Sequence, residues 1–207
     1  MMYLFNWLKP KNRNEMIVDM SDIIPDKVEV EVELPKIRVI DIFDSSKPSI
    51  LIIDDSKGII SIVEDYIAEC GINKDSYNIL SFYGNFAPFV MVQTLQQLKD
   101  KYGFVKVDYA IIDIVLPGKM KVDGKYVKWD GIDVAIYLHG AYNLRNFVFY
   151  TGNIINAYVE FIKDKVEKFS SYFNKDMTSH VIFKGESSDE LTVKEFCKLL
   201  LKEKYAV

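Results

Sequence analysis

The chain has 207 residues, of which 49% are hydrophobic and 27% are charged. This size suits one main domain plus a tail and leaves little room for a second full domain. A formal charge of −4, with no basic stripe along the expected helices, argues against a nucleic-acid partner. The apolar start of the chain breaks off at Lys9-Pro10-Lys11, far too early to span a bilayer, and we expect no transmembrane segment.

The two cysteines, Cys70 and Cys197, lack the close spacing of a metal or redox pair. Each falls within an amphipathic helical pattern, so both are expected to be buried thiols in a reducing environment. A cytoplasmic location is the expectation that follows.

Residues 1–46 differ in character from the rest, and we expect them to form an N-terminal extension to a main domain over 47–207. Within the extension, apolar and charged residues alternate strictly over 28–34, which is the period of a half-buried strand. A second strand is expected over 37–43. Because single strands leave backbone groups unpaired, these strands must pair with each other, cover a sheet edge or dock on a partner.

From Ser49 onward, short apolar runs alternate with longer segments of helical period. This alternation is typical of βαβ units and predicts a doubly wound α/β domain around a five-stranded parallel sheet. The expected strand order is the flavodoxin-like one, 2-1-3-4-5. The predicted strands cover residues 49–54, 77–82, 108–113, 146–150 and 180–183, and the predicted helices cover 57–70, 86–101, 131–141, 154–173 and 190–203.

Acidic residues end two of these strands. Asp54 and Asp55 follow the first, and Asp113 ends the almost wholly apolar third strand. In the flavodoxin-like order these strands are neighbours, so the carboxylates would converge at the crevice where open parallel sheets bind ligands. Such a cluster repels itself unless a hard cation compensates it, and Mg²⁺ suits a few carboxylates plus water and phosphate oxygens. Bound Mg²⁺ would keep Asp113 ionised and able to attack phosphorus.

Two further strand ends carry suitable chemistry. Thr151 offers a hydroxyl directly after the fourth strand, and Lys184 offers a compact cation directly after the fifth. Taken singly, each residue has an ordinary interpretation, since an acid such as Asp55 after a strand is more often a helix cap than a ligand. Together, the five residues supply nucleophile, metal site, hydroxyl and ammonium, which is the equipment of phosphoryl transfer.

Over residues 48–205 the chain resembles the receiver domains of two-component response regulators. The resemblance rests on Ile52-Ile53-Asp54-Asp55, Asp113-Ile114-Val115-Leu116-Pro117-Gly118, Tyr150-Thr151-Gly152 and Phe183-Lys184. It implies that Asp113 is the phosphoacceptor and that Asp54, Asp55 and the backbone carbonyl of Val115 hold Mg²⁺ beside it. It also implies that Thr151 follows the phosphoryl group during activation and that Lys184 pairs with it.

The resemblance implies a stand-alone signalling switch that catalyses only its own phosphorylation and dephosphorylation. A histidine kinase or a phosphotransfer protein would donate the phosphoryl group, and output would pass through protein contacts. The predicted helix over 154–173 is long and carries an aromatic stripe. In the family, the face formed by the fourth helix, fifth strand and fifth helix makes output or dimer contacts, although such a stripe is more often simply core.

Two departures from the family pattern leave an alternative open. The usual Lys-Pro is Lys184-Gly185 here, and Val181 stands where an aromatic switch residue is usual. The alternative is a degenerate receiver-fold interaction module that works without phosphorylation. A haloacid-dehalogenase-like phosphatase also uses an Asp after an apolar strand, but Val115 stands where that family needs a second Asp.

The family's Asp-Gly after the conserved Pro is displaced here to Asp130-Gly131. Alternating segments before it flank Asp123-Gly124, a strong hairpin signal, so we predict a β-hairpin over 119–129 that protrudes over the phosphorylation site. Its lysines suit contact with an acidic partner or a gate on access of the phosphoryl donor. A solvated surface insertion without a role explains the segment equally well.

Overall fold

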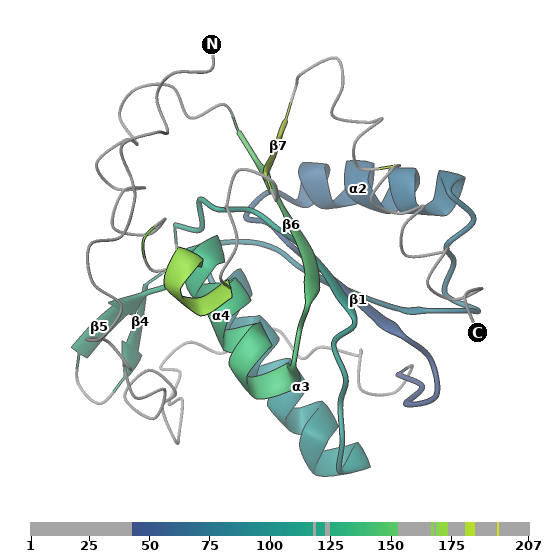
Figure 1. Ribbon diagram of the computed structural model, residues 1–207, viewed down its shortest axis with the longest axis horizontal. Coiled ribbons are helices and arrows are strands. Elements are labelled where there is room, and N and C mark those ends of the chain that lie inside the picture. Colours follow the sequence, from purple (N-terminus) through teal and green to yellow (C-terminus); the bar gives the residue numbers. More distant parts are fainter. Residues whose placement is uncertain are drawn as a thin grey trace.

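The structure is a computed structural model in which residues 43–117, 119–122, 125–152, 167, 169–173, 181–184 and 194 are described. Within these ranges the chain forms a sheet with helices packed on it (Figure 1). None of the helices in these ranges is both long and apolar enough to cross a membrane.

A parallel sheet forms the centre of the domain (Figure 1). Its strand order is β2-β1-β3-β6-β7, and each neighbouring pair runs parallel. The predicted order of the first four strands, 2-1-3-4, is confirmed. The strands are β1 (Ser49–Ile53), β2 (Asn78–Phe82), β3 (Tyr109–Ile112), β6 (Asn146–Thr151) and β7 (Val181–Phe183).

Helices cover both faces of the sheet (Figure 1). On one face, α2 packs through Ile60, Val63 and Ile67. On the other face, α3 and α4 belong to a larger cluster that contains Phe147 and Phe149 of β6. Every residue of β1 and β3 is buried, which explains why these central strands are apolar toward both faces. The helix bounds are α2 (Lys57–Glu69), α3 (Ala87–Tyr102) and α4 (Gly131–Tyr142).

An antiparallel pair of short strands, β4 (Lys119–Val122) and β5 (Lys125–Lys128), separates β3 from α4. Trp129 follows β5 and is buried, and its ring centroid lies 6.1 Å from that of Phe89 in α3 and 5.2 Å from that of Tyr137 in α4. These contacts anchor the exit of the pair between the two helices. The turn between β4 and β5 lies outside the described residues, and a position of the pair over the predicted phosphorylation site stays a prediction.

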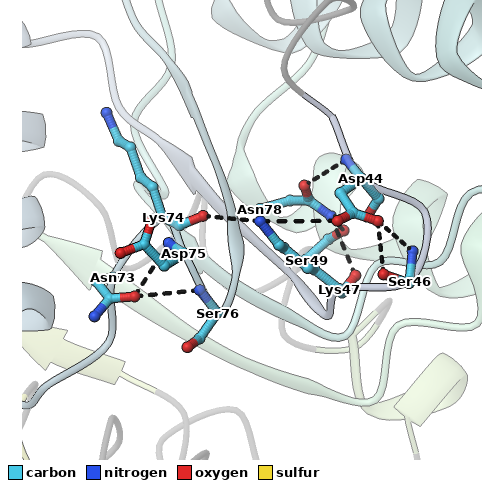
Figure 2. A network of polar contacts seen from close by, with 9 residues as sticks. All are labelled: Asp44, Ser46, Lys47, Ser49, Asn73, Lys74, Asp75, Ser76 and Asn78. Carbon is cyan, nitrogen blue, oxygen red and sulfur yellow. Dashed lines mark hydrogen bonds and ion pairs between the residues drawn. The ribbon is translucent and has the colours of Figure 1, made fainter.

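The segment before β1 is tied to the start of β2 by a polar network (Figure 2). The Asp44 N–H donates to Oδ1 of Asn78 at 2.9 Å, and Nδ2 of Asn78 donates to the carbonyl oxygens of Asp44 at 2.7 Å and Lys47 at 3.1 Å. Phe43 is buried, with its ring centroid 5.4 Å from that of Tyr102 at the end of α3. The segment from Phe43 onward therefore packs against the domain.

Other predicted elements lie wholly or partly outside the described residues. The helix predicted over 154–173 is helical at 167 and 169–173, and the one predicted over 190–203 is helical at 194. The extension up to residue 42, Gly185 and Cys197 lie outside. Cys70 is half-buried rather than fully buried: it forms the C-terminal cap of α2 and packs against the core cluster on that face of the sheet.

Candidate phosphoryl-acceptor site

The carboxyl ends of β1 and β3 lie side by side and carry two of the predicted acids. The Asp113 N–H donates to the carbonyl of Ile53 at 2.7 Å, and the Asp54 N–H donates to the carbonyl of Phe82 at 3.1 Å. The hydrogen-bond ladder of the sheet thus extends one residue beyond each strand and fixes both backbones. The side chains of Asp54 and Asp113 are buried, since these residues are only 2% and 5% exposed.

Asp55 completes a cluster of three carboxylates. One oxygen from each of Asp54, Asp55 and Asp113 lies within 4.8 Å of the other two. Asp55 is exposed while the other two acids are buried, so the cluster opens to solvent on one side. A few carboxylate oxygens with room for water is the donor set that Mg²⁺ takes from a protein. The residues present therefore fit a divalent cation of this type.

Lys184 reaches the same point from the end of β7. Its Nζ lies 2.6 Å from Oδ2 of Asp54 and 3.0 Å from Oδ2 of Asp113. Its backbone N–H donates to the carbonyl of Thr151 at 2.8 Å, which fixes the start of the side chain beside β6. One ammonium group therefore bridges the two buried carboxylates, and the side chain is 15% exposed.

The buried Asp54 carboxyl ionises less readily than one in water. Burial raises the pKa of the Asp54 carboxyl from its ordinary value of 3.8 to about 6. Loss of hydration is the largest cause, and the charge of Asp113 adds to it, while hydrogen bonds from Lys184 and the Ser56 backbone act in the opposite direction. A further cation beside Asp54 would favour its ionised form for the same electrostatic reason as Lys184 does.

Thr151 contributes a buried hydroxyl at the end of β6. Within the part of the chain that the structure describes, Oγ1 of Thr151 has no hydrogen-bond partner. A buried hydroxyl that makes no hydrogen bond is unfavourable by about 1–3 kcal/mol, so a ligand oxygen that accepts from it would recover that free energy.

Local hydrogen bonds hold the acids in place. Oδ1 of Asp54 accepts from the Ser56 N–H at 2.8 Å, and Ser56, not Asp55, is the N-terminal cap of α2. This leaves the Asp55 carboxylate available as a ligand. Oδ1 of Asp113 accepts from the Val115 N–H at 3.2 Å, which orients the loop after β3. Metal binding by the Val115 carbonyl stays a prediction.

The start of α4 packs against the loop that carries Asp113. Asp130 caps the helix, because its side chain accepts from the N–H groups of Ile132 and Asp133 at 3.0 Å. The next residue, Gly131, donates its N–H to the carbonyl of Ile114 at 3.0 Å. A Cβ at Gly131 would lie 2.1 Å from the carbonyl oxygen of Asp113. Only glycine allows this close approach of helix and loop.

Sequence reasoning identified Asp130-Gly131 as a displaced motif but missed that Gly131 touches the backbone of Asp113. It also missed the contact between Tyr150 and Lys184, in which the ring centroid lies 5.6 Å from Nζ. No spacing in the sequence signals a contact between side chains of two neighbouring strands. The aromatic position expected from the family is occupied by Val181, which is half-buried and packs against the larger core cluster.

Among known proteins, similar ones are found among the solved structures. No family model matches the chain, and no curated protein matches it. A two component transcriptional regulator AraC from Clostridium phytofermentans is similar at 15% identity and a TM-score of 0.44, over 78% of this chain and 100% of that chain. The signal receiver domain of a protein from Vibrio parahaemolyticus is similar at 14% identity and a TM-score of 0.43, over 78% and 98%.

A third similar structure is the receiver domain of a Francisella response regulator. It is 18% identical, with a TM-score of 0.40, over 74% of this chain and 99% of that chain. These solved structures are receiver domains or two-component regulators.

Proposed function

We propose that this chain is a response-regulator receiver in which Asp113 accepts a phosphoryl group. The observation that carries the proposal is the convergence of four charged side chains at one edge of the sheet. Three carboxylates lie within 4.8 Å of one another, and an ammonium contacts two of them. At the end of the neighbouring strand β6, the buried Thr151 hydroxyl has no hydrogen-bond partner among the described residues. Phosphoryl transfer depends on positioning and charge neutralisation, and these groups provide both.

The chemical step is a transfer between two oxygen or nitrogen atoms. A carboxylate oxygen of Asp113 attacks phosphorus and forms an O–P bond, while the bond from phosphorus to the donor breaks and the donor leaves with that electron pair. Lys184 already contacts Oδ2 of Asp113 at 3.0 Å, so its charge lies beside the incoming phosphoryl oxygens. The Thr151 hydroxyl donates to one of these oxygens.

The same acids form the metal site of the proposal. Asp54, Asp55, Asp113 and the backbone carbonyl of Val115 would hold Mg²⁺, which supplies positive charge to the phosphoryl oxygens. The raised pKa of Asp54, about 6, arises mainly from burial, and a bound cation would supply the nearby positive charge that favours the ionised carboxylate.

The direct test is phosphorylation by a small donor. We expect incubation with Mg²⁺ and acetyl phosphate to add one phosphoryl mass that survives acid and is lost in base, as an acyl phosphate should be. The Asp113→Asn variant should lose this addition, and the exposed Asp65→Asn variant on α2 should keep it. Absence of incorporation into the unaltered chain with any donor would overturn the proposal.

In the cell, the proposed donor is a histidine kinase or a phosphotransfer protein in the cytoplasm, and the protein is a switch rather than an enzyme with its own turnover. Output would pass through protein contacts or a dimer on the face that includes β7. The complete five-stranded flavodoxin-like order, with the hairpin inserted after the third strand, belongs to this proposal. The degenerate-module alternative is not favoured, because the residues expected of a working site lie together.

A further inference from the structure

Tyr150 lies under the ammonium group of Lys184. It precedes Thr151 in β6, is 3% exposed, and belongs to the core cluster on the α2 face of the sheet. Its ring centroid is 5.6 Å from Nζ of Lys184, within the distance of about 6 Å at which an aromatic face attracts a cation. The ring is held by the core, so it presents a fixed surface to a long side chain.

The ring differs from the other partners of Lys184 in carrying no charge. The other two contacts of Nζ are carboxylate oxygens of Asp54 and Asp113. Under the proposed function, a cation takes up the charge of Asp54 and a phosphoryl group is attached to Asp113. Both carboxylates that contact the ammonium would then have another partner. The face of Tyr150 keeps its attraction for the ammonium, because neither event changes the ring.

We propose that Tyr150 is a positioning residue that holds the Lys184 ammonium over its ring face, so that the cation stays at the phosphoryl oxygens after its carboxylate partners are engaged. This inference rests on the proposed function and extends it to a residue that touches neither metal nor phosphoryl group. It predicts that the electron-rich face of the ring, and not merely its bulk, determines how tightly the site holds a phosphoryl-like anion.

The test compares variants by their affinity for beryllium trifluoride, a phosphoryl mimic, in the presence of Mg²⁺. Tyr150→Leu should bind it about 2- to 30-fold more weakly, the range that a cation–π contact of about 0.5–2 kcal/mol supports. Tyr150→Phe should bind beryllium trifluoride as tightly as the unaltered protein does, since it keeps the aromatic ring. Replacing Tyr150 by pentafluorophenylalanine, which keeps the shape but inverts the charge distribution of the face, should weaken binding as Leu does.

Two controls separate positioning from general damage to the core. Tyr109→Leu removes another buried tyrosine of the same cluster. Tyr109 is the first residue of β3, at the end of that strand away from Asp113, so this variant should leave the affinity for beryllium trifluoride unchanged. In a Lys184→Gln background, the effect of Tyr150→Leu should vanish, because the ring then has no cation to hold. Equal losses with and without Lys184, or wild-type affinity in the pentafluorinated protein, would overturn the inference.

A second measurement does not depend on phosphorylation. In protein with ¹³C-labelled lysine and no ligand, the ring current of Tyr150 should displace the CεH₂ proton signal of Lys184 from the position that it has when residue 150 carries no ring. This displacement should persist in Tyr150→Phe and disappear in Tyr150→Leu. An undisplaced signal in the unaltered protein refutes the contact itself, whereas a displaced signal without anion binding refutes the proposed function and leaves the contact standing.

Discussion

Replacing Gly131 by alanine tests whether the start of α4 holds the loop of Asp113 in place. The new Cβ would lie 2.1 Å from the carbonyl oxygen of Asp113 and 2.9 Å from Cα of Ile114. Both are backbone atoms, so no side-chain rotation relieves the clash. To bring the shortest contact to 3.0 Å, the helix and the loop must separate by about 0.9 Å.

We expect Gly131→Ala to lower the free energy of unfolding by about 1–3 kcal/mol, the usual effect of overpacking a dense interior. The rate of phosphorylation should fall by up to about 100-fold, because moving a reacting group by about 1 Å has an effect of that size. The assay combines denaturant unfolding with the time course of phosphoryl incorporation from acetyl phosphate, followed by mass.

Gly58→Ala is the matched control. Gly58 lies in the first turn of α2, and a Cβ there would meet only Oγ of Ser56 at 3.7 Å. Its rate should be unchanged and its stability equal or higher, since alanine suits a helix better than glycine. A Gly131→Ala variant as stable and as fast as the unaltered protein would refute the reasoning. A variant that loses stability but keeps its rate would show that the contact packs the helix without positioning Asp113.

Three further predictions follow from the charges and hydrogen bonds of the structure. Without Mg²⁺, Asp54 alone should raise the free energy of unfolding by about 1 kcal/mol as the pH falls from 7.5 to 5, because between pH 3.8 and about 6 the folded carboxyl binds more protons than the unfolded one. Thermal unfolding of Asp54→Asn should lack this increment, and an identical pH profile in both proteins would contradict it. Mg²⁺ at about 100 times its dissociation constant should add about 2.7 kcal/mol to the free energy of unfolding near pH 7.5. The increment should be smaller below pH 6, where protons compete for Asp54. Calorimetry that finds the same increment at both pH values would count against the metal site. Asn78→Ala should lower the free energy of unfolding by about 1–3 kcal/mol, because it leaves backbone groups of Asp44 without partners. The phosphorylation rate should stay unchanged, since Asn78 is the first residue of β2 and the site lies at the opposite ends of the strands. A slower rate would show that the network around Asn78 affects the acids.

The order of the first four strands and the closeness of the three acids could be predicted because both depend on local sequence patterns. The run from Tyr109 to Ile112 is apolar throughout, as a strand buried on both faces requires. An acid directly after such a run has its backbone fixed by the sheet and its side chain at the ligand-binding edge. Asp54 and Asp113 follow their strands in this way, and the structure joins them through neighbouring strands.

The contacts that position these acids could not be predicted, because they arise from packing between distant segments. Gly131 approaches the carbonyl of Asp113 only once α4 has docked on the sheet. Tyr150 approaches Lys184 only because β6 and β7 pair in a register that aligns Tyr150 with Ile182. The pKa of Asp54 likewise depends on burial that no spacing of residues reveals. Composition and periodicity carry no information about such distances.

The hydrogen bond between Gly131 and Ile114 closes a loop in the chain. The backbone leaves the sheet after Asp113, passes through β4 and β5, and returns to within 3.0 Å of its point of departure. A segment whose two ends are held together can change in length with little loss of stability, because the entropic cost of closing a loop grows only slowly with its number of residues. The segment between Pro117 and Trp129 is therefore free to diversify for new partners while the acids beside it keep their geometry.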